Sequence, residues 1–217
     1  MPLELMVEAV GKTSVAFTGL VFGEMLLQRW RQTGSRVILH WAVMVLSAMG
    51  YLLGALIILG RGNPATLTRL HYLAAAAAVF PGALAATILL LPIPSEWADR
   101  LSLYLPLGLF IVSGAFLLFS PLLSGPPREA WSYVGFFRVA YVALVMIAGL
   151  FSTATLLYLT VRLKIVGYLI MAAAFLLITV GGTLVGGNVI NLALAEVVLM
   201  AGYVMFYMVF MALMRAK

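Results

Sequence analysis

Long apolar stretches alternate with short polar breaks along the whole of this 217-residue chain. A helix needs about 20 apolar residues to cross the roughly 30 Å of hydrocarbon in a bilayer, and each stretch reaches that length. The pattern predicts seven transmembrane helices, near residues 6–28, 37–60, 71–93, 101–122, 132–161, 165–187 and 189–214. Ten-residue segments of alternating polarity, which are typical of membrane β-barrels, are absent from the sequence. The predicted fold is therefore an all-α polytopic bundle.

Composition supports a membrane protein and excludes several other classes. Hydrophobic residues make up 65% of the chain and charged residues 9%, against about 45–50% and 25% in a soluble domain. Residues 1–217 are expected to form a single transmembrane domain in a lipid bilayer, because no loop has room for a soluble domain. The 13 Lys and Arg residues form no basic run, so nucleic acid is not an expected partner. With no cysteine, disulfides and thiolate sites are excluded.

The distribution of positive charge predicts the orientation in a multi-pass cell-membrane protein, because Lys and Arg are retained on the cytoplasmic side. The first, third and fifth loops and the C-terminus hold Arg29, Arg31, Arg36, Arg100, Arg162, Lys164, Arg215 and Lys217. The loops on the other side hold Arg61, Arg69 and Arg128. We therefore expect the N-terminus outside and the C-terminus in the cytoplasm.

Smaller features predict local details of the bundle. Pro81 and Pro106 lie inside predicted helices, where each removes one backbone hydrogen bond and favours an irregular segment. The Gly62–Pro64 segment reads as a turn between helices. All four tryptophans fall near segment ends, where indole rings favour the membrane interface: Trp30, Trp41, Trp97 and Trp131.

A small set of polar residues lies inside the predicted spans, where ionisable groups are costly. With a rise of about 1.5 Å per residue, Lys12, Arg138 and Glu196 each lie roughly 9–10 Å below the outer helix ends. The candidate ligand-binding residues at this level are Glu8, Lys12, His71, Arg138, Asn191 and Glu196. Glu8 stands four residues before Lys12, so the two can pair on one helix face.

Two interpretations of this outer-leaflet cluster stay open. The polar residues can satisfy one another, with Arg138 pairing with Glu196 and Lys12 with Glu8. Alternatively, they line a pocket in which the cations hold an anionic or carbonyl-bearing ligand and Glu196 accepts protons.

The histidines raise the question of haem b. The segment from Arg36 to Trp41 resembles the Arg-x-x-His-Trp entry of membrane cytochromes b, with one extra residue before His40. The resemblance implies His40 as an axial ligand, and His71 is the second candidate. However, His40 begins a helix that runs outward and His71 one that runs inward, so a single haem shared by the two is not expected. A haem held by one histidine with a methionine or lysine as the second ligand stays open.

Our leading hypothesis is a non-catalytic membrane-embedded subunit of a larger respiratory or electron-transfer complex. Its outer-leaflet pocket would meet a quinone-type ligand or a partner, either another membrane subunit or a second copy of the chain. A small-solute or ion transporter that uses the same Lys, Arg and Glu residues is the alternative, and a seven-helix sensor ranks below it. A retinal protein is excluded because residues 189–214 contain no lysine. No paired acid–base or metal constellation indicates an enzyme.

Overall fold

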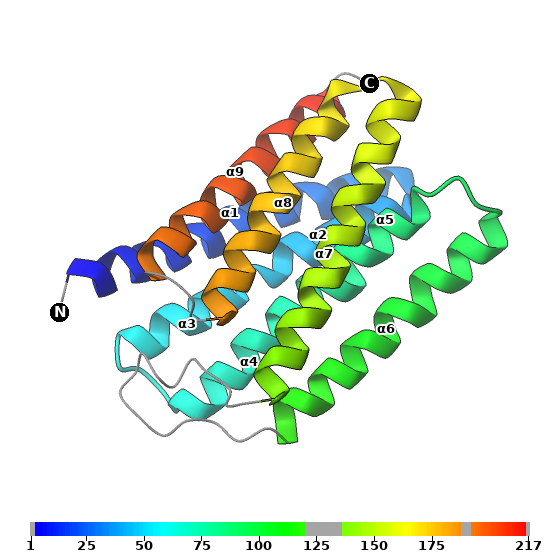
Figure 1. The fold of residues 1–217 in the computed structure, drawn as a ribbon. Helices are drawn as coiled ribbons and strands as arrows, with labels where there is room; N and C mark the ends of the chain where they lie inside the picture. The colour runs from blue at the N-terminus through cyan, green and yellow to red at the C-terminus, as the bar shows by residue number, and fades with distance from the viewer. Residues whose placement is uncertain (1–2, 120–135, 188–191, 216–217) are drawn as a thin grey trace.

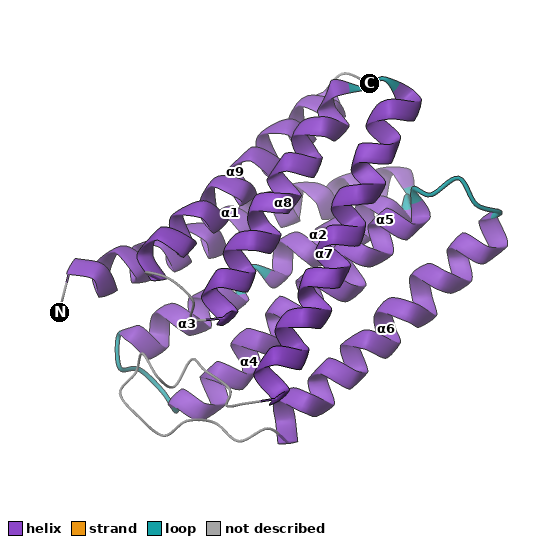
Figure 2. Cartoon of the chain, in the orientation of Figure 1, coloured by secondary structure: helices purple, strands orange, loops and turns teal. Residues whose placement is uncertain are grey.

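The computed structural model describes residues 3–119, 136–187 and 192–215 (Figure 1). This part of the chain contains helices and short connections, and no strand (Figure 2). The elements are α1 (Leu3–Thr33), α2 (Arg36–Ser47), α3 (Gly50–Ile58), α4 (Pro64–Ala77), the π-helix η1 (Ala78–Leu84), α5 (Ala85–Leu89), α6 (Ser95–Phe119), α7 (Phe136–Leu163), α8 (Val166–Gly187) and α9 (Leu192–Arg215).

These elements form seven helical segments, called passes here, which fit an α-helical membrane bundle. α2 continues into α3, and α4 continues through η1 into α5, so each of these sets makes one pass. In the described residues, six passes are long and apolar enough to span a bilayer, and Val197–Ala212 forms a shorter apolar part of α9. The start of α1 and the end of α9 lie at opposite ends of the bundle (Figure 1). Which end faces the cytoplasm stays a prediction.

The third pass begins earlier than the sequence pattern predicted. α4 starts at Pro64 rather than near residue 71. Gly62 and Asn63 lie in the connection before it, as the predicted turn requires, and the last residue of that predicted turn, Pro64, is the first of the helix. The Asn63 side-chain oxygen accepts hydrogen bonds from the amides of Ala65 (3.0 Å) and Thr66 (3.2 Å). An Asn cap followed by proline at the first helical position is a favoured beginning, because proline lacks the amide that would need a partner.

The second pass contains a bend that the pattern did not predict. Between α2 and α3 the amides of Ala48 and Met49 bond to carbonyls three residues back, at 3.1 and 3.0 Å, and those of Tyr51 and Leu52 repeat this at 2.9 and 3.0 Å. These short-range bonds tighten the backbone in the manner of a 3₁₀-helix. The continuous segment predicted over 37–60 is therefore two consecutive helices, α2 and α3 (Figure 1).

The two membrane prolines have different effects. At Pro81 the backbone opens into the π-helix η1, which places one extra residue in the turn, as the missing amide favours. α6 runs through Pro106 without interruption, so the irregularity expected there is not observed. The third pass is therefore discontinuous at mid-length and the fourth is not.

Aromatic side chains join the two sides of the bundle. Trp41 is 1% exposed and packs against Phe175 of α8 (5.6 Å between centroids) and Phe206 of α9 (5.2 Å). Close packing against two further rings holds the indole inside the bundle, so it faces the core and not lipid. The depth of the indole relative to the membrane interface stays a prediction. The Trp97 side chain, in contrast, is 62% exposed.

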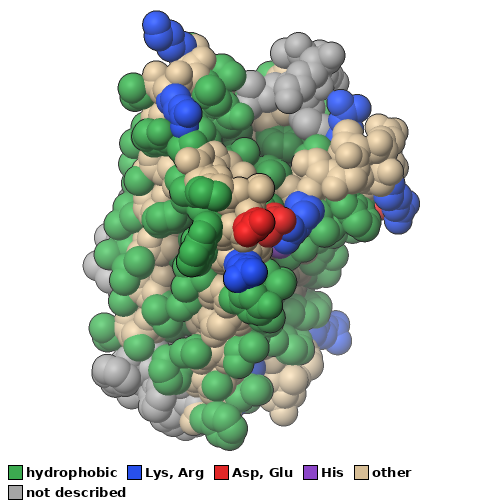
Figure 3. Space-filling view, turned by 90° about the vertical axis from the view of Figure 1, so that its right-hand side faces the viewer, with side chains coloured by type: hydrophobic (Ala, Val, Ile, Leu, Met, Phe, Trp, Pro, Cys, Tyr) green, Lys and Arg blue, Asp and Glu red, His purple; other side chains and the backbone are tan. Residues whose placement is uncertain are grey.

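Outside this core, hydrophobic side chains predominate on the face shown in Figure 3, as expected for a surface in lipid.

Two groups of helices can be distinguished around the core. α7, α8 and α9 pack side by side, while α1 packs on α2 and α3, and α6 packs along α4, η1 and α5 (Figure 1). The groups meet where α1 contacts α9 and where α7 contacts η1. The candidate site lies between them.

Candidate functional site

Glu8 and Lys12 form a buried ion pair on α1. The Lys12 ammonium lies 3.4 Å from a Glu8 carboxylate oxygen, and the two side chains are 0% and 4% exposed. Pairing at this spacing follows the helical repeat that the sequence predicted. The ammonium also lies 5.7 Å from the centroid of the Tyr51 ring on α3, within the range of a cation–π contact. A full positive charge is thereby held inside the bundle with a counter-charge beside it.

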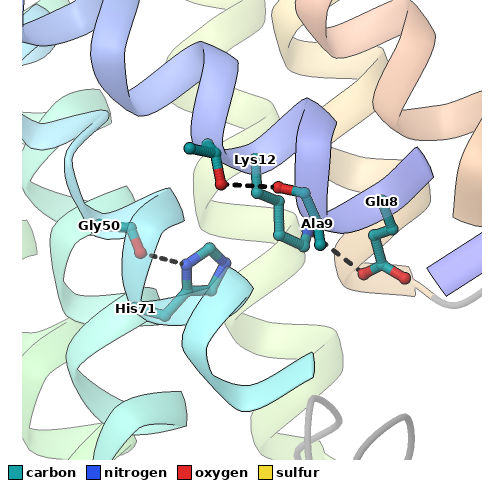
Figure 4. Close-up of polar contacts among 6 residues, drawn as sticks. Glu8, Ala9, Lys12, Gly50 and His71 are labelled. Carbon is teal, nitrogen blue, oxygen red and sulfur yellow. Dashed lines mark hydrogen bonds and ion pairs between the residues drawn. The ribbon is translucent and has the colours of Figure 1, made fainter. Parts of the chain in front are cut away.

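His71 lies next to this ion pair and joins α4 to α3. Its Nδ1 atom is 2.9 Å from the Gly50 carbonyl oxygen. Because a carbonyl can only accept, Nδ1 carries the hydrogen, and in the neutral ring Nε2 bears the lone pair. Figure 4 shows Lys12 between His71 on one side and Glu8 on the other. The residues Glu8, Lys12 and His71 predicted at one level are thus brought together.

Four tyrosines extend this group into a row of rings across the bundle, which we call the aromatic row. It runs from Tyr203 to Tyr51, His71, Tyr72 and Tyr141, on α9, α3, α4, α4 and α7. Successive centroids are 6.1, 5.3, 5.6 and 5.4 Å apart, all in edge-to-face geometry. Such pairs are favourable because the positive edge of one ring meets the negative face of the next.

A cavity of about 90 Å³ lies beside the aromatic row, and we call it the central cavity. All five rings of the row border it. Its remaining walls are largely apolar, with Phe175, Ile178 and Leu199 on α8 and α9. Small residues on the other walls, including Ala75, Ala78 and Gly149, leave the space open. The alanine run 74–78 of the third pass thus contributes two residues to a wall of this cavity.

For the other predicted site residues, the structure gives at most a position along a helix, without the side chain. Arg138 is on α7, three residues before Tyr141, and Glu196 is on α9, seven residues before Tyr203. These spacings are close to one and two helical turns. Their side chains are not among those that the structure describes, and Asn191 lies outside the described residues. A pairing of Arg138 with Glu196 stays a prediction.

His40 lies elsewhere in the bundle and has a partner of the same kind as His71. Its Nδ1 atom is 2.7 Å from the carbonyl oxygen of Pro81, in η1. Pro81 is ten residues beyond His71, or about 15 Å along the helix. The two histidines therefore contact sites too far apart to ligate one iron. Among the described side chains, no three His, Asp or Glu residues come together as a metal site.

The tyrosines of the aromatic row are the site residues that sequence reasoning missed. A tyrosine in the middle of an apolar span is a usable signal, because a buried hydroxyl generally needs a hydrogen-bond partner. Tyr141, for example, donates from its hydroxyl to the Tyr72 carbonyl at 3.0 Å. The sequence interpretation weighed ionisable groups and passed over these hydroxyls.

Comparison with known proteins adds no relative to this picture. The chain matches no protein-family model, no curated protein and no solved structure. Functional inference therefore rests on the central cavity and on the residues around it.

Proposed function

We propose that this protein is a non-catalytic, membrane-embedded subunit of an electron-transfer complex, and that its central cavity binds the ring of a quinone-type ligand. The observation that carries the proposal is the enclosure of an apolar cavity by the five rings of the aromatic row, with the Lys12–Glu8 pair directly behind it. Ligand sites of this composition, mostly apolar with a few polar groups, are common in proteins.

The walls suit a flat, uncharged ring that carries carbonyl oxygens. Aromatic edges and aliphatic side chains pack against such a ring, and tyrosine hydroxyls can donate to its oxygens. An apolar cavity of about 150 Å³ admits benzene. The central cavity, at about 90 Å³, accommodates a single ring after modest movement of its side chains. An isoprenoid tail would then extend between helices into lipid.

The buried lysine gives this ligand class an electrostatic rationale. A positive charge in a low-dielectric interior strongly favours negative charge nearby. Reduction of a quinone places negative charge on its oxygens, and Lys12, whose ammonium lies 5.7 Å from the ring of the cavity residue Tyr51, would favour that charge. Glu8 offsets the cost of keeping the ammonium charged when the ring is uncharged.

The partner subunits of the proposed complex would supply the chemistry. The connections among the described helices are short, and α6 exposes apolar side chains along its length, including Tyr104, Ile111 and Phe119 at 68%, 60% and 83%. Such a surface is suited to lipid or to other membrane helices. Purification together with further subunits would support this part of the proposal, and an active isolated chain would contradict it.

Filling the central cavity tests ligand binding. Val142 lines the cavity on α7, and Val139 on the same helix is 68% exposed. We expect purified protein to contain extractable quinone, Val142→Phe to lose it at least about tenfold, and Val139→Phe to retain it. Chromatography of lipid extracts measures the quinone content. No quinone in the wild-type extract, or equal content in both variants, would overturn the proposal.

Transport of a small solute or ion is the second candidate function. It is favoured by two neighbouring discontinuous passes, broken between α2 and α3 and at η1, because such breaks often form solute sites in transporters. The buried hydroxyls of Thr87 and Ser152, 3.2 Å apart, extend the polar groups beyond the central cavity. Proton or solute flux in proteoliposomes that Glu196→Gln abolishes would favour transport over the binding subunit.

A further inference from the structure

A groove lies between the end of α1 and the end of α9, away from the central cavity. Its volume is about 230 Å³. The side chains that line it are Met25, Leu26, Gln28, Arg29, Gln32, Phe210 and Met211. We call it the Arg29 groove.

The Arg29 groove has a polar side and an apolar side. Gln28, Arg29 and Gln32 stand within about one helical turn on α1 and form the polar side. The apolar side consists of Met25 and Leu26 of α1 with Phe210 and Met211 of α9. A groove divided in this way matches a molecule with a polar head and a hydrocarbon body.

The charge of the groove favours an anion. Among the side chains that the structure describes, no carboxylate lies within ion-pair distance of the Arg29 guanidinium. Glu24, one turn earlier on α1, accepts a hydrogen bond from Gln28 at 3.2 Å and is exposed. A guanidinium fits a phosphate with two parallel hydrogen bonds, and amide groups such as that of Gln32 add further donors.

The surroundings of the groove strengthen this preference. The order of the helices brings Arg31, Arg36, Arg162 and Lys164 to the same end of the bundle, at the end of α1, the start of α2, the end of α7 and the turn into α8. Clusters of basic residues at the end of transmembrane helices attract anionic lipid headgroups and repel cationic ones such as choline.

We infer that the Arg29 groove binds an anionic phospholipid, with its phosphate on Arg29 and its acyl chains along Met25, Phe210 and Met211. The methionines suit this role because their flexible side chains adapt to irregular hydrocarbon. Free phosphate shares the headgroup chemistry, but it would leave the apolar side of the groove uncovered. The site is independent of the ligand proposed for the central cavity.

Native mass spectrometry of the full-length protein in mild detergent tests the inference. The probes are phosphatidylglycerol, phosphatidylcholine and inorganic phosphate. We expect phosphatidylglycerol to bind about tenfold more tightly than phosphatidylcholine, and Arg29→Gln to remove about tenfold of that affinity, the effect of one charge-assisted hydrogen bond. Arg31→Gln, which removes an exposed charge outside the groove, is the matched control and should change binding less than twofold.

Three results would overturn the inference. Equal binding of phosphatidylglycerol and phosphatidylcholine would show that the headgroup charge is not recognised. Equal effects of Arg29→Gln and Arg31→Gln would show a diffuse electrostatic surface instead of a site. Displacement of phosphatidylglycerol by millimolar inorganic phosphate would identify free phosphate as the ligand. Each variant is compared by its circular dichroism spectrum, so that a folding defect is recognised separately.

Discussion

The Glu8–Lys12 pair shows how much one buried residue can depend on another. Both side chains are almost fully enclosed, so neither can exchange its partner for water. Removing one member of a buried pair leaves an uncompensated charge and typically costs about 3–5 kcal/mol, while replacing both is often nearly neutral. The pair therefore needs to be judged as a unit.

We predict that Glu8→Gln and Lys12→Met each lower the free energy of unfolding by about 3–5 kcal/mol, and that the double variant recovers most of this loss. Unfolding in mixed detergent micelles measures the effect. The matched control is the ion pair between Arg36 and Asp99, whose side chains are 46% and 56% exposed. Arg36→Gln is expected to cost at most about 1 kcal/mol, because water and lipid headgroups solvate the remaining carboxylate. A double variant as unstable as the two single losses combined would contradict the prediction.

Individual residues of the site were predictable from sequence to different degrees. The pairing of Glu8 with Lys12 follows from the helical repeat, and the structure shows it. The contact of His71 with Gly50 could not be predicted, because it depends on how closely α3 and α4 pack. The aromatic row depends on the rotation of four helices about their axes, which the distribution of apolar residues leaves undefined.

At the scale of elements, the discontinuous passes pack unusually closely. A Cβ built on Gly50 would lie 2.3 Å from the Cβ of Ala74, and one on Gly82 would lie 2.6 Å from the Met44 backbone. α3 meets α4, and η1 meets α2, at these two points. The absence of a side chain at each glycine is therefore required for the observed packing.

We predict that Gly50→Ala and Gly82→Ala each destabilise the protein by about 1–3 kcal/mol, because the helices must move apart to admit a methyl group. Gly108→Ala on α6 is the matched control, since nothing lies within 4 Å of the added Cβ. It is expected to be neutral or stabilising by up to about 1 kcal/mol through helix propensity. Thermal unfolding in detergent compares the three variants, and a control as destabilised as the other two would contradict the explanation.

The element boundaries illustrate why the pattern of apolar residues is an incomplete guide. The start of α4 could have been predicted from Asn63 and Pro64, which form a standard cap. The break between α2 and α3 contains no proline, and Gly50, which begins α3, packs closely on α4 beside it. Pro81 and Pro106 look alike in the sequence, yet η1 forms at the first alone. Tertiary packing thus decides where an allowed irregularity occurs.

At the scale of the whole molecule, basic residues are distributed unequally between the two ends of the bundle, and this distribution predicts a membrane orientation that can be tested. The ends of α1 and α7 and the starts of α2 and α6 hold Arg29, Arg31, Arg36, Arg100 and Arg162 at one end of the bundle. The start of α4 and the connection before it hold Arg61 and Arg69 at the other. The first end is expected to face the cytoplasm.

The absence of cysteine from the sequence makes this orientation directly measurable. Single cysteines at two exposed positions, Ala65→Cys near the start of α4 and Ser95→Cys at the start of α6, report on opposite ends. In intact cells, a membrane-impermeant maleimide is expected to label Ala65→Cys and not Ser95→Cys. Both should react after the cells are opened. The reverse pattern would invert the orientation and place the Arg29 groove outside.

The hydrogen bonds of the two histidines have a mechanical consequence. Going from His40 to Gly50 advances ten residues along one pass, and going from Pro81 to His71 returns ten residues along its antiparallel neighbour. Two hydrogen bonds about 15 Å apart therefore link the passes, and sliding one pass along the other would require both bonds to break. The central cavity lies between this doubly bonded pair of passes and the helices α7, α8 and α9.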